Sequence, residues 1–119
     1  MRVDKMVTAA VAALEDIKGR DIVVLDVRRM TALFDKLIVA SGDSARQNKA
    51  LANHVQEKLK ARGATVYGVE GADSGEWVLV DLGAVVVHIM QPATRQYYNL
   101  EELWGDAAAL PRRRAAGAI

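Results

Sequence analysis

The sequence predicts an α/β domain in which a mixed five-strand sheet has helices packed on its faces. Five short apolar segments have the composition of strands, and two longer segments repeat their apolar residues at helical spacing. Glycine, serine and proline residues separate most of these segments and mark the turns between them. Strands that alternate with helices along a chain favour a sheet covered by helices.

The chain opens with an amphipathic helix that we expect to end at Gly19, a residue suited to the position after a helix C-terminus. Its apolar residues recur at helical spacing: Val7, Val11, Leu14 and Ile17. Two strands follow, at 21–27 and 34–40, with a turn at 28–32 between them. A short connection of this kind is most simply explained by an antiparallel pair.

The main helix is predicted to begin at Ser44, which forms a capping box with Gln47. Its apolar stripe consists of Leu51, Ala52, Val55 and Leu59, and Gly63 closes it. A strand at 65–69 comes next. Because a helix joins it to the strand at 34–40, we expect a right-handed parallel crossover.

Two further strands, at 76–81 and 85–90, are joined by so short a link that they must form an antiparallel hairpin. Pro92 suits the first turn of a helix, where its missing N–H costs nothing. Asn99 is expected to cap a last short helix, with Glu102 completing a capping box.

Composition indicates a single domain over residues 1–110 and a basic tail over 111–119, which we expect to be disordered. The chain has no cysteine, which excludes disulfides, thiolate metal sites and thiol nucleophiles. It also shows no signal peptide and no apolar run of membrane-spanning length. A cytoplasmic location is the natural expectation.

The net charge of +1 conceals an uneven distribution. Arg112, Arg113 and Arg114 account for three of the sixteen basic residues, so that thirteen face fifteen acidic residues elsewhere. A slightly acidic domain argues against nucleic acid as the main ligand, since phosphate binding requires clustered positive charge. The arginine run is expected to be a solvated tail, with peripheral contact to RNA as the alternative.

Between Arg62 and Arg95 the chain contains no lysine or arginine. An acidic stretch that also carries large apolar groups has the composition of a docking surface for a basic partner. The residues that give the stretch this character are Glu70, Asp73, Glu76, Trp77, Asp81 and Leu82.

Strand alternation places Trp77, Leu79 and Asp81 on one face of the sheet. A core position and an interface position are equally good explanations of Trp77, although a carboxylate seldom lies unpaired in a core. Leu82 occupies a turn position and is expected to project outward, as an apolar anchor with an acidic rim.

A second aromatic group, Tyr97, Tyr98 and Trp104, follows close to the C-terminus. The simplest explanation is a helix that docks on the sheet, chiefly through Leu100 and Leu103. The alternative is that the aromatic residues extend the same interface.

The sequence predicts no catalytic, cofactor or metal site. His54 fits a boundary or surface position on its helix, and His88 fits a core position with a hydrogen-bonded partner. The pair Ser41-Gly42 resembles the opening of a nucleotidyltransferase site, but no D-x-D pair for Mg²⁺ occurs anywhere in the chain. A nucleotide-handling enzyme that uses only the scattered Asp35, Asp43 and Asp81 is the less favoured alternative.

Five blocks of sequence resemble the ribosomal silencing factor, or Iojap, family. The resemblance covers roughly residues 4–107, and the order and spacing of the five blocks make it specific. The blocks are DIVVLDV (21–27), LIVASGDSARQNKALA (37–52), GVEG (68–71), WVLVDLGAVVVHIM (77–90) and RQYYNLEELWGDA (95–107). The resemblance implies a nucleotidyltransferase-like fold without the catalytic acids.

It also implies binding to the large ribosomal subunit through its protein fourteen. Family members obstruct joining of the small subunit and so repress translation when nutrients are short, and some take part in large-subunit maturation. No cofactor is implied. Whether the free protein is a homodimer is left open, since a sheet edge or the anchor face could self-associate.

By position, Trp77, Asp81 and Leu82 match the partner-contacting segment of the family, and Glu70 and Glu76 would complete its acidic rim. The later aromatic residues match the C-terminal motif of the family: Tyr97, Tyr98 and Trp104. Ala84 departs from the pattern, because many members carry an acid there, so one negative charge is missing near the expected contact.

Overall fold

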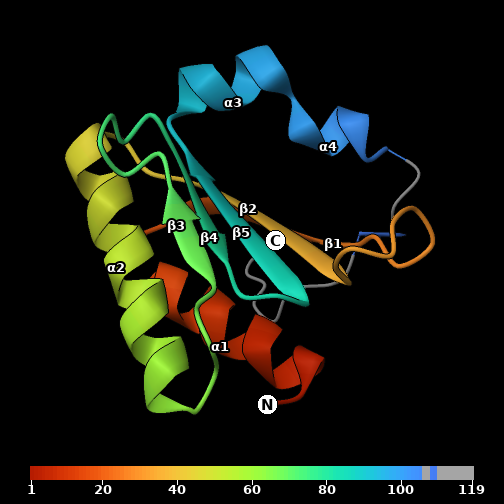
Figure 1. The fold of residues 1–119 in the computed structure, drawn as a ribbon. Helices are drawn as coiled ribbons and strands as arrows, with labels where there is room; N and C mark the ends of the chain where they lie inside the picture. Colours follow the sequence, from red (N-terminus) through yellow and green to blue (C-terminus); the bar gives the residue numbers. More distant parts are fainter. Residues whose placement is uncertain (106–107, 110–119) are drawn as a thin grey trace.

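A mixed sheet runs through the centre of the molecule, and helices lie against both of its faces (Figure 1). The structure is a computed structural model that describes residues 1–105 and 108–109. Its helices are α1 (Val3–Asp16), α2 (Ala45–Ala61), α3 (Pro92–Tyr98) and α4 (Leu100–Leu103). Its strands are β1 (Arg20–Asp26), β2 (Lys36–Ser41), β3 (Gly68–Glu70), β4 (Trp77–Asp81), β5 (Val85–Met90) and β6 (Ala108–Ala109). The predicted α/β fold and its mixed sheet are confirmed.

The strands lie in the order β3-β4-β5-β2-β1-β6. Only β2 and β5 pair in parallel, and every other neighbouring pair is antiparallel, including the predicted β4–β5 hairpin. β3 begins at Gly68, three residues later than predicted, and runs parallel to β2 as expected. It is not the neighbour of β2, however, because the hairpin lies between them.

The sixth strand, β6, is not predicted by the sequence. It consists of two alanines that pair with Leu25 and Asp26 at the edge of β1. Two alanines show neither the alternation nor the β-branched composition by which a strand is recognised. The predicted domain boundary at residue 110 and the basic tail over 111–119 lie outside the described residues.

One face of the sheet is covered by α1 and α2, and the larger part of the core lies there (Figure 1). Small side chains on α1, such as those of Ala10 and Ala13, are buried and let the helix approach the sheet closely. From β4 and β5 the residues that face these helices have no exposed surface: Val78, Val80, Val85, Val87 and Ile89.

The opposite face is covered only in part, by the short helices α3 and α4 (Figure 1). Leu100 is buried there and Trp104 packs against Phe34, whereas Leu103, which was expected to dock on the sheet, is exposed. Apart from the half-buried His88, the residues of β2 and β5 on this face are buried, whereas those of β4 are half-buried: Trp77, Leu79 and Asp81. The cover therefore leaves the β4 side of this face partly open.

Both long helices end in Schellman motifs. In α2 the left-handed residue is Gly63, with a φ of 91°, as predicted. In α1 it is Lys18, with a φ of 68°, and Gly19 follows it and donates to the Leu14 carbonyl at 2.7 Å. The placement of Gly19 was therefore off by one residue. A Cβ on Gly19 would lie 2.8 Å from that carbonyl oxygen, which explains the glycine.

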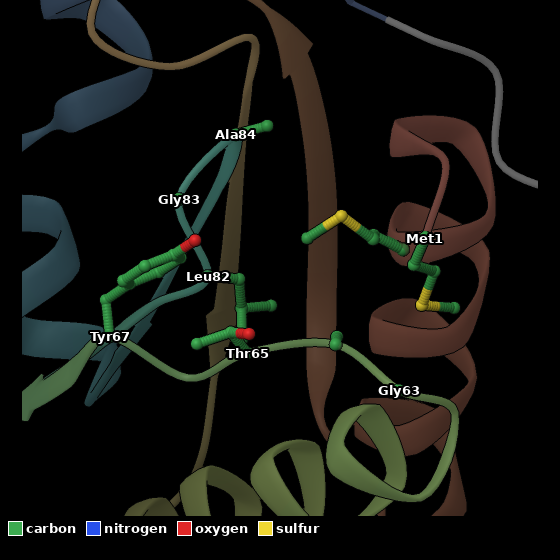
Figure 2. Close-up of a pocket in the computed structure, with 9 residues that line it drawn as sticks. Met1, Gly63, Thr65, Tyr67, Leu82, Gly83 and Ala84 are labelled. Carbon is green, nitrogen blue, oxygen red and sulfur yellow. The ribbon is translucent and has the colours of Figure 1, made fainter.

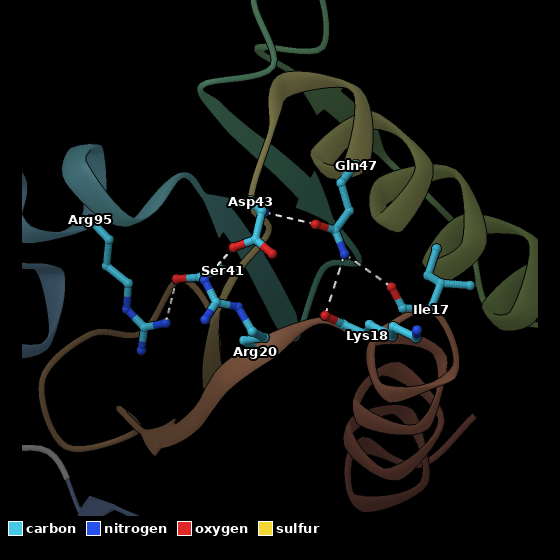
Figure 3. Close-up of polar contacts among 7 residues, drawn as sticks. All are labelled: Ile17, Lys18, Arg20, Ser41, Asp43, Gln47 and Arg95. Atoms are coloured by element: carbon cyan, nitrogen blue, oxygen red, sulfur yellow. Dashed lines mark hydrogen bonds and ion pairs between the residues drawn. The ribbon is translucent and has the colours of Figure 1, made fainter.

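The helix N-termini follow the predictions only in part. Ser44 Oγ accepts from Gln47 N at 3.0 Å, but the Gln47 side chain accepts from Asp43 N instead of completing the box (Figure 3). It also donates to Ile17 O, which ties the end of α1 to the start of α2. Pro92 begins α3 as expected. Asn99 caps α4 only through its backbone, without a side-chain hydrogen bond. The same residue is the left-handed C-cap of α3.

Candidate partner-binding face

Trp77 lies half-buried on the open part of the sheet, and its side chain makes one hydrogen bond and one aromatic ring contact. Its indole Nε1 donates to Nδ1 of His88 on the neighbouring strand at 2.8 Å. The ring of Tyr98, at the end of α3, lies 4.8 Å away between centroids at an interplanar angle of 47°. Trp77 is therefore neither a fully buried core residue nor a fully exposed one, and its place in an interface stays a prediction.

His88 has the hydrogen-bonded partner that the sequence predicted, although it is half-buried and not fully enclosed. Because an indole N–H can only donate, Nδ1 of His88 must accept, which places the ring proton on Nε2 of a neutral imidazole. Burial lowers the pKa of His88 from 6.5 to about 4, so the ring stays neutral at neutral pH. The neutral imidazole that accepts the hydrogen bond from Trp77 is therefore the form present at neutral pH.

Leu82 does not project outward, and this expectation is wrong: the residue is only 2% exposed. Leu82 N donates to Val85 O at 2.9 Å, so the hairpin pairing continues one residue past Asp81 and leaves Gly83 and Ala84 alone in the loop. Strand alternation then points Leu82 to the face opposite Asp81, toward α1. There it lines a cavity of about 250 Å³ together with Met6 and Tyr67 among others (Figure 2).

The three carboxylates predicted for the rim have different environments. Asp81 is half-buried, and its Oδ1 accepts from Gly83 N at 2.8 Å, so one oxygen holds the hairpin turn. Glu70, opposite Leu79 in the β3–β4 register, is exposed. Glu76 is also exposed and directly precedes β4. Asp81 and Glu70 flank the half-buried residues of β4, while Glu76 stands at the start of the strand.

The C-terminal aromatic residues separate into two places. Tyr98 covers Trp77, and Tyr97 meets Tyr98 edge-on at 5.0 Å, with 81% of its surface exposed. Trp104 belongs instead to the packing of α4, where its ring lies 5.8 Å from Phe34. The structure thus joins Tyr97 and Tyr98 to Trp77, and it does not join Trp104 to them.

We use the term Trp77 face for this half-open part of the sheet and its edge. The name covers the residues Glu70, Trp77, Leu79, Asp81, His88, Tyr97 and Tyr98.

A polar clasp that the sequence did not predict holds α3 in place over this face. Arg95 Nη1 donates to the buried Ser41 Oγ at 2.9 Å (Figure 3), and its Nη2 pairs with Glu101 Oε2 at 3.0 Å. The clasp joins β2, α3 and α4, and it therefore fixes the helix that carries Tyr98. No local sequence pattern indicates this clasp, because Arg95 and Ser41 lie 54 residues apart in the chain.

The carboxylates of the enzymatic alternative are not brought together. Asp43 pairs with Arg20 at the Ser41 end of the sheet (Figure 3). Asp35, whose N–H donates to Ala84 O, and Asp81 lie at the opposite end, beside the hairpin turn. Within residues 1–105 and 108–109, no three histidine or acidic side chains are grouped to hold a metal ion. In the same residues no helix is long and apolar enough to cross a membrane.

Comparison with known proteins gives consistent matches over most of the chain. A family model described as "Ribosomal silencing factor during starvation" matches residues 1–117. Ribosomal silencing factor RsfS of Chromobacterium violaceum is 58% identical over 105 residues, which are 88% of this chain and 86% of that protein. A crystal structure of a protein from the same organism has a TM-score of 0.87 at 58% identity and covers 88% of both chains.

A more distant match comes from an animal. "Mitochondrial assembly of ribosomal large subunit protein 1" of Mus musculus is 35% identical over 97 residues, which are 79% of this chain and 42% of that longer protein.

Proposed function

This chain belongs to the ribosomal silencing factor family, and we propose that it binds the large ribosomal subunit through ribosomal protein fourteen and blocks joining of the small subunit in the cytoplasm. Family membership supports a ribosomal partner. The choice of protein fourteen and the block on joining extend beyond that membership and rest on the resemblance of the partner-contacting segment.

The Trp77 face is the observation that carries the proposal. It presents half-buried Trp77 and Leu79 and exposed Tyr97 beside the carboxylates of Glu70 and Asp81. Aromatic anchors within a polar rim are the usual composition of a binding hot spot. Because no lysine or arginine lies between residues 63 and 94, a basic and partly apolar partner surface would complement this face.

The mechanism that we propose is steric and requires no cofactor. The Trp77 face docks on the ribosomal protein, and the layer formed by α1 and α2 on the other side of the sheet occupies space that the small subunit needs. No covalent bond is made or broken in this scheme. The side chains of the face are held in advance by the His88 hydrogen bond and the Tyr98 contact, which reduces the entropy lost on binding.

Two measurements with purified ribosomal subunits test the proposal. The protein should cosediment with isolated large subunits and not with small subunits, and it should lower the light-scattering increase that accompanies subunit joining. Calorimetric titration with isolated protein fourteen tests the named partner separately. Normal joining at saturating protein would disprove the block.

Participation in large-subunit assembly is a second candidate, favoured by the mouse relative whose name states that role for that protein. A factor of this kind would bind precursor particles without affecting joining. Accumulation of large-subunit precursors in a strain that lacks the gene, together with normal joining in vitro, would favour assembly over silencing.

A further inference from the structure

We infer that the cavity beside Trp77 receives a lysine or arginine side chain of the partner, and the identity of that partner rests on the proposed function. The cavity has a volume of about 300 Å³ and is lined by Glu70, Gly71, Trp77 and Leu79. It opens on the Trp77 face, between the edge strand β3 and its neighbour β4.

The register of two strands builds this cavity. Glu70 is paired with Leu79, and Trp77 lies two residues before Leu79 on the same face of β4. Gly71 forms the remaining wall with a φ of 83°, and a Cβ there would lie 2.0 Å from Trp77 O. Only glycine fits at this position, so Gly71 lines the cavity with backbone atoms alone.

The side chains that line the cavity offer acceptors and no donor. The single N–H of the indole is already engaged by His88, so Trp77 presents only its aromatic surface. The Glu70 carboxylate accepts hydrogen bonds and carries a negative charge. A positively charged group that donates hydrogen bonds complements this lining best, and the ammonium of lysine and the guanidinium of arginine meet both conditions.

The part of the chain that the structure describes does not supply this cation. Among the described residues, the Glu70 side chain has no hydrogen bond or ion pair, whereas Asp16, Asp26, Asp43 and Glu101 are all paired with basic side chains. No lysine or arginine occurs from residue 63 to residue 94. Glu70 is thus a carboxylate that lies beside an aromatic ring and pairs with no basic side chain among the described residues.

The direct test uses the isolated protein and a small cationic probe. Acetylated tri-arginine amide is titrated into ¹⁵N-labelled protein at low ionic strength, and the indole N–H signals of Trp77 and Trp104 are followed by NMR. We expect a saturable shift of the Trp77 signal and none of the Trp104 signal, which lies in the α4 packing. Tri-citrulline of the same length, which has nearly the shape of the arginine peptide without its charge, should shift neither.

Matched variants locate the interaction. Glu70→Gln should weaken tri-arginine binding by about two- to five-fold, as expected for one partly solvated charge pair. Glu57→Gln removes a charge of the same kind from an exposed residue of α2, which covers the other face of the sheet and does not line the cavity, and it should leave the affinity within error. Equal binding of tri-citrulline, or affinity unchanged by Glu70→Gln, would overturn the inference.

The same variants separate this inference from the proposed function. If tri-arginine binds in the expected way but the protein does not cosediment with large subunits, the cavity stands and the ribosomal role fails. If wild type and Glu70→Gln bind large subunits equally and tri-arginine does not shift Trp77, the ribosomal role stands and the cavity assignment fails.

Discussion

Trp77 and His88, on adjacent strands of the sheet, are joined by a hydrogen bond of 2.8 Å from the indole N–H to the imidazole Nδ1. The bond uses the only donor of the indole and fixes the tautomer of the imidazole. Together with the ring of Tyr98, it holds a half-exposed tryptophan in one orientation on the surface. A rigid aromatic group of this kind loses little conformational freedom on binding.

Trp77→Ala should weaken binding to the large subunit by about 2 kcal/mol or more, roughly thirty-fold in Kd, as expected for the loss of a hot-spot residue. The measurement is a cosedimentation titration with wild type and variant side by side. Leu33→Ala is the control, because Leu33 is 84% exposed and lies outside the Trp77 face. Equal losses in the two variants would contradict the assignment of the face.

Leu82→Ala should act mainly on stability. Leu82 is buried in the core cluster beneath the hairpin, and truncation of such a leucine costs about 2–5 kcal/mol of the free energy of unfolding. Urea unfolding measures this cost. Leu82→Met keeps most of the side-chain volume and should restore stability and ribosome binding together. Loss of binding in a Leu82→Ala protein that is as stable as wild type would indicate direct contact with the partner instead.

Arg95→Met removes the clasp and should lower the free energy of unfolding by about 2 kcal/mol, because the partly buried Glu101 loses its partner. It should also weaken large-subunit binding, since α3 carries Tyr98 over Trp77. Arg20→Met is the matched control. The pair of Arg20 with Asp43 is much more exposed, so its loss should cost less than about 1 kcal/mol. Similar losses of unfolding free energy in the two variants would show that the clasp stabilises the protein no more than an exposed ion pair does.

The stability of the protein should depend on pH through His88. Burial lowers its pKa from 6.5 to about 4, so between these values the unfolded chain binds a proton that the folded chain does not. The free energy of unfolding therefore falls as the pH drops from 6.5 toward 4 and gains nothing further from this group above 6.5.

The variant His88→Gln keeps an acceptor for the indole but cannot titrate in this range. Its urea-unfolding curves should show a shallower loss of stability over the same pH interval than those of wild type. His54→Gln, which alters the histidine paired with Asp16 on the other side of the molecule, should retain the part of the slope that is due to His88. Parallel curves for wild type and His88→Gln would show that His88 is not responsible.

Local patterns predicted most of the fold because each depends on neighbouring residues. The hairpin of β4 and β5 followed from a link too short for any other arrangement, and Ser44 and Gly63 marked the ends of α2 through the geometry of helix termini. The antiparallel pairing of β1 with β2 was predicted correctly, but the neighbour of β2 on its other side could not be predicted in this way. That neighbour depends on where the hairpin inserts in the sheet, and this is a long-range choice.

The candidate site was predicted unevenly for the same reason. Trp77, Leu79 and Asp81 could be placed on one face by alternation along a strand, and the structure adds Glu70, His88 and Tyr98 beside them. Leu82 was misplaced because the length of the hairpin loop depends on one backbone hydrogen bond, from Leu82 to Val85, that the sequence does not reveal. The clasp through Arg95 depends on residues brought together from three elements.

The sequence by itself determined the α/β class, the acidic stretch without lysine or arginine, and membership of a family, because composition, periodicity and the order of motifs are properties of the linear chain. Only the tertiary structure decided that α3 and α4 cover part of one sheet face, that Leu82 lies inside and that Trp77 remains half-exposed beside an unpaired Glu70. Burial and pairing depend on what packs above each strand, and that depends on contacts between residues far apart in the chain.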